Sequence, residues 1–172
     1  QCGHDHGHHA GSAYNALTDT IEFSKAVDAA MRKTSPRDTL IIVTADHSHV
    51  LNLAGYPTRG NPILGKVTGN NEHGEPKSTF DLAADNKPYT TLSYANGLGF
   101  HNLSNETDAD AVYDEEAVSG RDNHDLMKVN TLASGYHQEA LVPLKSETHS
   151  AEDVSIYARG PGARLVTSTS EQ

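Results

Sequence analysis

The chain has 172 residues, a length that suits one domain, with 23 acidic and 13 basic side chains and a formal charge of −10. This charge argues against a nucleic-acid-binding protein and against docking on an anionic membrane, because both need a basic surface. The apolar stretches are short, so we expect no transmembrane segment. The single cysteine cannot form an internal disulfide, which leaves the redox compartment open. Histidine is unusually abundant, with 11 residues, and 4 of them lie within the first nine positions.

The first half of the chain predicts a helix followed by a strand. Apolar residues recur every four positions between residues 10 and 33, which predicts a helix with a broad buried face: Leu17 and Ile21, then Phe23, Val27 and Met31. Pro36 should end this helix. The run 39–44 is continuously apolar or β-branched, which is typical of a strand covered on both faces in a parallel sheet. Helix, loop and buried strand together predict an α/β fold.

The middle of the chain has a different character. Residues 55–139 are rich in Gly, Asn, Asp, Thr and Pro, and we expect an irregular insert with short strands, for instance at 89–94. The acidic stretch 105–116 should be exposed. Regular structure is expected to return at 153–158 and to turn at 160–162. The predicted division is therefore an α/β core segment at 1–55, an irregular insert at 56–145, and a return to the core at 146–172.

The first chemical motif is the His-rich start of the chain. Asp5 and His9 are four residues apart, so a carboxylate oxygen and an imidazole can converge on one cation. A carboxylate with neutral imidazoles suits zinc better than magnesium or calcium. The alternative is a solvated His-rich terminus or an expression-tag remnant that binds metal only adventitiously.

Two further motifs follow strands or precede them. Asp46, His47 and His49 come directly after the predicted buried strand, where open α/β sheets place their ligands. The alternative is that Asp46 caps the next element and both histidines are surface residues. His149 lies in the polar cluster 146–153, and it gains weight only in combination with the other two motifs.

In this order, Asp5-x-x-x-His9, Thr-Ala-Asp46-His47-Ser-His49 and Glu-Thr-His149 resemble the C-terminal part of alkaline phosphatases. The stretches 6–9, 55–61, 94–97 and 158–161 are also similar to that family, so the resemblance runs across nearly the whole chain. It implies part of a three-layer α/β/α sandwich, with the irregular segment as a crown-like insert. It also implies that His4 occupies a buried strand position.

The resemblance implies a site with two zinc ions and one magnesium ion. Asp5, His9 and His149 match ligands of the first zinc, and Asp46 and His47 match ligands of the second. His49 matches a histidine that orients a carboxylate of the first site. His6 matches a position near the phosphate and the magnesium-bound water.

No catalytic residue is expected within this chain. The family's serine nucleophile, its phosphate-binding arginine and most magnesium ligands precede the matching region, so we expect a C-terminal fragment that is inactive alone. The parent enzyme is expected to hydrolyse phosphate monoesters, with metal ions stabilising the attacking and leaving oxygens. The family implies a homodimer and a periplasmic or secreted location.

Two other functions remain open from the sequence. One is a related metallo-enzyme, such as a phosphodiesterase, a sulfatase or a cofactor-independent phosphoglycerate mutase, which shares the Asp/His layout but uses another nucleophile. The other is a non-enzymatic His-rich module for metal binding or storage.

Overall fold

The computed structural model describes residues 2–103, 116–121 and 125–166, with side chains from residue 5 onward. Its content is mixed, with two helices, nine short strands and two 3-10 turns in the described residues. The helices and 3-10 turns are α1 (Cys2–His9), α2 (Ala13–Lys33), η1 (Leu126–Lys128) and η2 (Ala163–Leu165). The strands are β1 (Ile41–Val43), β2 (Ser48–His49), β3 (Leu51–Leu53), β4 (Leu92–Gly97), β5 (His101–Asn102), β6 (Tyr136–His137), β7 (Ala140–Pro143), β8 (His149–Ser150) and β9 (Tyr157–Arg159).

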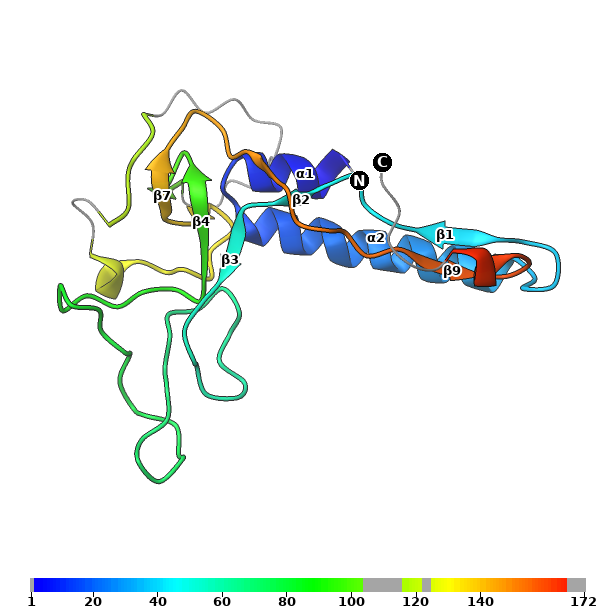
Figure 1. Ribbon diagram of the computed structural model, residues 1–172. Coiled ribbons are helices and arrows are strands. Elements are labelled where there is room, and N and C mark those ends of the chain that lie inside the picture. Colours follow the sequence, from blue (N-terminus) through cyan, green and yellow to red (C-terminus); the bar gives the residue numbers. More distant parts are fainter. Residues whose placement is uncertain (1, 104–115, 122–124, 167–172) are drawn as a thin grey trace.

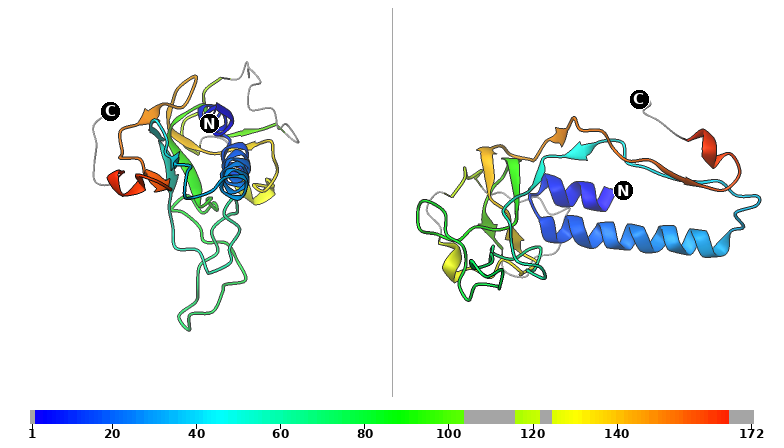
Figure 2. Two further views of the ribbon diagram at one scale, coloured as in Figure 1. Left: turned by 90° about the vertical axis from the view of Figure 1, so that its right-hand side faces the viewer. Right: turned by 60° about the horizontal axis from the view of Figure 1, so that its bottom comes forward.

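The two helices form an antiparallel pair at the start of the chain (Figures 1 and 2). Ser12 is the N-cap of α2, and its hydroxyl accepts a hydrogen bond from the Asn15 backbone N–H. The close approach of the helices depends on Gly7, because a Cβ there would lie 2.6 Å from the backbone nitrogen of Ala16. The expectation that His4 occupies a strand is therefore wrong, since its segment is helical and packs as α1 against α2.

The end of α2 is as predicted, but its buried face is not. The helix stops at Lys33, with Thr34 extended and Pro36 two residues later. Only its first turns are buried, at Ala13, Asn15 and Ala16. Ile21 is 56% exposed, and Phe23 and Met31 are exposed as well, so the predicted broad buried face is wrong. Among the described residues, α1 covers only the N-terminal part of α2 (Figure 2).

The strand predicted at 39–44 forms as β1, but its pairing differs from the prediction. β1 pairs antiparallel with β9, with Ile42 opposite Ala158. Ile42 is half exposed, so the expectation of a parallel strand covered on both faces is wrong for this segment. β9 includes only the last part of the strand expected at 153–158, and the turn at 160–162 follows it as predicted.

The described part of the middle segment is irregular, as expected, and it supplies the hydrophobic core. β4 lies in a three-stranded sheet, antiparallel to β3 and parallel to β7, and it begins three residues after the start of the strand expected at 89–94. Isolated bridges tie the long loop below the sheet in Figure 1. The acidic stretch 105–116 lies outside the described residues except for Glu116, which is exposed. The main buried apolar side chains are Val67, Leu92, Tyr94, Leu98, Leu126 and Tyr136.

The sheet also bears on the expected division of the chain. It combines β3, from the predicted core segment, with β4 and β7 from the predicted insert. The boundaries at 55 and 145 and the three-layer sandwich stay predictions. None of the described helices is both long enough and apolar enough to cross a membrane.

Candidate metal centre

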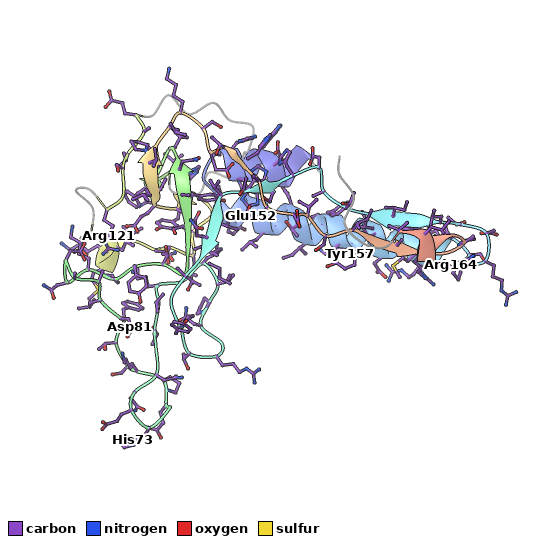
Figure 3. The ribbon with its side chains drawn as sticks, in the orientation of Figure 1. His73, Asp81, Arg121, Glu152, Tyr157 and Arg164 are labelled. Carbon is purple, nitrogen blue, oxygen red and sulfur yellow. The ribbon has the colours of Figure 1, made fainter. Side chains whose placement is uncertain are left out.

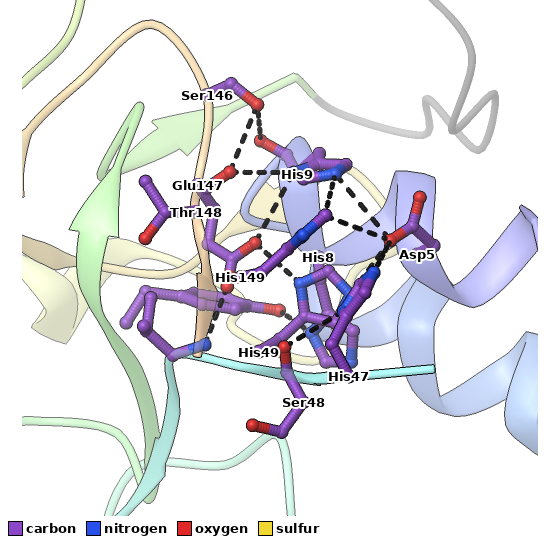
Figure 4. A network of polar contacts seen from close by, with 12 residues as sticks. Asp5, His8, His9, His47, Ser48, His49, Ser146, Glu147, Thr148 and His149 are labelled. Carbon is purple, nitrogen blue, oxygen red and sulfur yellow. Dashed lines mark hydrogen bonds and ion pairs between the residues drawn. The ribbon is translucent and has the colours of Figure 1, made fainter. Parts of the chain in front are cut away.

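Three segments far apart in the sequence bring a carboxylate and several histidines together (Figure 4). The segments are α1, the stretch leading into β2, and the stretch leading into β8. The side chains they contribute are Asp5, His8, His9, His47, His49, Glu147 and His149. Most of this cluster therefore comes from the motifs that the sequence singles out.

Local geometry explains how each segment presents its ligand atoms. Asp5 and His9 are one helical turn apart on α1 and so share a face of that helix. β2 pairs antiparallel with β8, and His49 lies directly opposite His149 in the register. His47 is two residues before His49, and both rings contact Asp5. Backbone pairing thus places histidines separated by 100 residues side by side.

One atom, Oδ1 of Asp5, is the centre of the cluster. Four ring nitrogens face it: Nε2 of His49 at 3.0 Å, His9 at 3.6 Å, His149 at 3.8 Å and His47 at 3.9 Å. This oxygen is buried and has no partner in hydrogen-bond geometry among the described residues. A buried carboxylate oxygen without such a partner is costly unless a cation or proton lies near it.

The charge state of Asp5 reflects this environment. Partial burial raises the pKa of the Asp5 carboxyl, but the electrostatic influence of His9, His49 and His149 outweighs burial. The pKa of Asp5 therefore lies below its usual range. Asp5 is consequently a carboxylate at neutral pH, which is the form that binds a metal ion.

Three of the histidines are held through their other ring nitrogen. Nδ1 of His9 lies 2.7 Å from the backbone oxygen of Glu147, and Nδ1 of His47 lies 3.2 Å from the backbone oxygen of Ser48. Nδ1 of His49 lies 2.7 Å from Oε2 of Glu147. Because a backbone carbonyl oxygen only accepts hydrogen bonds, the neutral rings of His9 and His47 carry their proton on Nδ1 and leave Nε2 with a lone pair. Metal-binding histidines are commonly oriented in this way. His49 lies between two carboxylates, those of Glu147 and Asp5.

His149 completes the cluster from the more exposed side. Its side chain is 49% exposed, and its Nε2 lies 3.3 Å from Nε2 of His9. Its ring stacks on that of His47, with 3.4 Å between the ring centroids. Two ring nitrogens that face each other need a shared proton or a shared cation between them.

The donor set fits zinc. Two groups of three ligand atoms each lie within 4.8 Å of one another, namely Asp5, His47 and His149, and His9, His49 and Glu147. Carboxylate oxygens with several imidazole nitrogens are typical zinc ligands, whereas magnesium and calcium prefer oxygen alone. These groups divide the residues differently from the sequence-based assignment of Asp5, His9 and His149 to one ion and Asp46 and His47 to another. The individual ligand roles stay predictions.

Two residues expected at the site lie at its edge or outside the cluster. The Asp46 side chain is 65% exposed, and its Oδ2 lies 3.6 Å from Nε2 of His47. It is thus near the cluster but is not among the groups that surround Asp5. His6 follows Asp5 on α1 and is exposed. Its predicted position near phosphate stays a prediction.

Two residues of the cluster, and a tyrosine that contacts it, were not assigned a role from the sequence. Glu147 lies two residues before His149 within the quoted motif, and a carboxylate so close to a candidate metal ligand could have identified it. His8 stacks on His49, with 4.4 Å between the centroids, and its Nδ1 lies 2.8 Å from the Tyr94 hydroxyl. Burial, followed by the negative charge of Glu147, strongly raises the pKa of Tyr94, so this hydroxyl stays protonated. No sequence signal links Tyr94 to residues 86 positions earlier.

Comparison with known proteins identifies one family along nearly the whole chain. The sequence model of the alkaline phosphatase family matches residues 3–172. The tissue-nonspecific isozyme of alkaline phosphatase from Gallus gallus is 39% identical over 168 residues, which are 98% of this chain and 27% of that relative. The same isozyme is 36% identical in Felis catus and 35% in Homo sapiens, each over 168 residues with the same coverage. The chain thus spans 27% of the length of these relatives. From its motifs, its clustered ligand atoms and these matches, the chain belongs to the alkaline phosphatase family.

Proposed function

We propose that this chain forms part of the active site of a zinc-dependent enzyme that hydrolyses phosphate monoesters. In this proposal Asp5, His9 and His149 hold one zinc ion, and Asp46 and His47 hold a second. The observation that carries it is the convergence of four imidazole Nε2 atoms on Oδ1 of Asp5, a buried oxygen without a hydrogen-bond partner among the described residues. Membership of the alkaline phosphatase family supports the reaction class.

The residues of the chain have defined tasks in this proposal. Zinc, when bound, stabilises charge on phosphoryl oxygens and lowers the pKa of an attacking hydroxyl or water. Asp5 supplies the negative charge that makes a dication favourable at this position. His9 and His47 present lone pairs because backbone carbonyl oxygens accept hydrogen bonds from their Nδ1 atoms. His49, with Nε2 at 3.0 Å from Oδ1 of Asp5, orients the Asp5 carboxylate. His149, the most exposed ring of the four around Asp5, lies on the side from which a phosphate ester would reach the metal.

The remaining catalytic groups are proposed to come from other parts of the full-length enzyme. They are a serine nucleophile, a phosphate-binding arginine, a carboxylate shared between zinc and magnesium, and most of the magnesium ligands. His6 is proposed to lie near the phosphate, on the exposed side of α1. The full-length enzyme is proposed to be a periplasmic or secreted homodimer, built on a three-layer α/β/α sandwich.

Zinc titration of the purified chain tests whether the ligand motifs form one centre. We expect His9→Ala and His149→Ala each to weaken zinc binding strongly, and the double variant to lose little more than either alone, because the rings share one site. Independent and additive losses would contradict the proposal and favour a His-rich module in which residues 4–9 bind metal alone.

An assay with p-nitrophenyl phosphate and zinc tests the division of catalytic groups. We expect no turnover by the 172-residue chain, because it is proposed to lack the nucleophile. Clear turnover that His149→Ala abolishes would contradict this division. It would mean that the groups within this chain suffice for catalysis.

A further inference from the structure

His149 differs from the other three histidines around Asp5 in how its ring is held. Oxygen atoms lie at hydrogen-bond distance from Nδ1 of His9, His47 and His49. Among the described residues, no oxygen accepts a hydrogen bond from Nδ1 of His149, whose ring instead contacts Asp5, His9 and His47. The position of this ring therefore depends on the backbone that carries it.

The strand pairing that carries His149 is short. β2 and β8 have two residues each, and their pairing consists of Ser48 opposite Ser150 and His49 opposite His149. Two paired strands without further support are only marginally stable in water. An attachment on the other side of His149, at the residue before it, would therefore help to hold the ring in place.

Asn96, in the central strand β4, supplies such an attachment. Its Nδ2 donates a hydrogen bond to the Thr148 hydroxyl at 2.9 Å, and its Oδ1 accepts one from the Thr148 backbone N–H at 2.9 Å. A backbone N–H can only donate, so the amide oxygen faces it and the NH2 group faces the hydroxyl. Figure 4 shows Thr148 on the side of its segment that is turned away from Asp5. Asn96 thus holds the residue next to His149 without touching the metal centre.

We infer that Asn96 is a positioning residue, whose two hydrogen bonds fix the backbone of Thr148 and so hold the His149 ring at the metal centre. β4 lies in the three-stranded sheet and carries the buried side chains of Leu92 and Tyr94. The hydrogen bonds therefore connect the most exposed histidine of the cluster to the hydrophobic core. Ligands are placed most precisely where rigid elements support them. The inference rests on the proposed function in taking His149 as a zinc ligand.

Asn96→Leu removes both hydrogen bonds with little change in size, and Asn61→Leu is the matched control. Asn61 is half-buried like Asn96, and its side chain also accepts from a backbone N–H, that of Thr68 at 3.2 Å, and donates to the Pro62 carbonyl at 3.1 Å. We expect Asn96→Leu to weaken zinc binding about 10-fold and Asn61→Leu to leave it unchanged. Wild-type affinity in a folded Asn96→Leu variant, or equal losses in both variants, overturns the inference.

Thr148 gives a second test at an exposed position, where substitution leaves the core intact. Thr148→Val removes the hydroxyl at constant shape, whereas Thr148→Ser keeps it. We expect Thr148→Val to weaken zinc binding and Thr148→Ser to match the wild type. The double variant of Asn96→Leu and Thr148→Val should lose no more affinity than Asn96→Leu alone, because the hydroxyl acts through Asn96. Additive losses, or wild-type affinity in Thr148→Val, overturn the inference.

The position of the His149 ring can also be measured on the metal-free chain at alkaline pH. Nuclear Overhauser contacts between the stacked rings of His149 and His47 should be present in the wild type and in Thr148→Ser, and should be lost in Asn96→Leu. Their absence from the wild type overturns the inference whether or not the variants fold. A folded Asn96→Leu variant that keeps them also overturns it.

This last readout separates the inference from the proposed function, because it needs neither zinc nor turnover. An inactive full-length enzyme in which these ring contacts depend on Asn96 would contradict the proposed function alone.

Discussion

Gly97 packs directly against Glu147, and a Cβ at residue 97 would lie 3.3 Å from the Cβ of Glu147. Gly97 is the last residue of β4 and has a φ of +134°, a conformation that L-residues with side chains rarely adopt. The buried carboxylate that contacts His49 therefore has the backbone of the central strand behind it. The position of the metal centre depends on a residue with no side chain.

Gly97→Ala should destabilise the fold and weaken zinc binding together. The positive φ costs about 1–3 kcal/mol for a residue with a Cβ, and the added methyl group displaces Glu147 from its hydrogen bonds. Denaturant unfolding and zinc titration of the same variant measure both effects.

Gly74→Ala is the control, because Gly74 also has a positive φ, +79°, but open space around its Cβ position. It should lower the free energy of unfolding and leave zinc affinity intact. If both variants bind zinc as the wild type does, the contact between Gly97 and Glu147 has no part in shaping the site.

Zinc should stabilise the chain through His149. At a free zinc concentration of about 100 times Kd, binding adds about 2.7 kcal/mol to the free energy of unfolding. His149→Ala should abolish most of this gain at little cost to the metal-free fold, because half of the side chain is exposed. Thermal unfolding with zinc and with a chelator measures the difference.

His73→Ala is its control, since His73 lies at the tip of the long loop and is 74% exposed (Figure 3). This variant should keep the whole zinc-dependent gain. A gain that disappears in both variants would show that zinc acts through scattered surface histidines.

Asp85 should make stability depend on pH. Arg121 donates hydrogen bonds from two nitrogens to the two carboxylate oxygens, at 2.8 and 3.1 Å, and these lower the pKa of Asp85. A lowered pKa stabilises the fold above the unfolded value of about 3.9, and the contribution is lost as pH falls through the folded pKa. Asp85→Asn should thus be less stable than the wild type at neutral pH.

The difference in the free energy of unfolding between Asp85→Asn and the wild type should disappear in acid. Urea unfolding at neutral and acidic pH measures this difference. Glu72→Gln, at a side chain that is 87% exposed, should match the wild type at neutral pH. A deficit in Asp85→Asn that persists unchanged in acid would mean that the amide disrupts packing instead.

Gln138 should hold the turn between the two helices. It is buried, its Oε1 accepts a hydrogen bond from the Ala13 N–H at 2.7 Å, and its own N–H donates to the Gly11 carbonyl at 2.9 Å. Gln138→Ala leaves the Ala13 N–H without its acceptor and should cost about 1–3 kcal/mol.

The exposed Asn130→Ala, which also removes an amide that accepts a backbone N–H, should cost much less by the same denaturant unfolding measurement. Equal losses in the free energy of unfolding of the two variants would show that burial of the Gln138 hydrogen bond adds nothing to its contribution to stability.

The sequence predicted the ligand-bearing motifs better than it predicted their surroundings. Asp5 and His9 are related by a helical turn, which spacing alone reveals. Glu147 and Tyr94 act through contacts with residues about 90 positions or more away, and only the folded chain brings these residues together. Ligands related by local spacing could be predicted from the sequence, whereas the residues that orient these ligands through distant contacts could not.

The same distinction applies to the fold. Pro36 and Ser12 determine the ends of α2 by local backbone effects, and the end at Pro36 was predicted. The helical state of the first residues was not predicted, because Gly3, Gly7 and the histidines have weak helix propensity and α1 forms against α2. The apolar residues Ile21 and Ile42 predicted burial, but the covering they require is not among the described residues.

Because β2 and β8 pair in a fixed register, the number of residues next to each histidine decides which face of the strand its ring occupies. His49 is opposite His149, and side chains alternate between the two faces of each strand. Removing or adding one residue between Glu147 and His149 would turn one ring away from the other, whereas length changes in the long loop leave this pairing intact. An engineer could therefore change the length of that loop at its exposed tip around His73, but would have to keep the number of residues around each histidine unchanged.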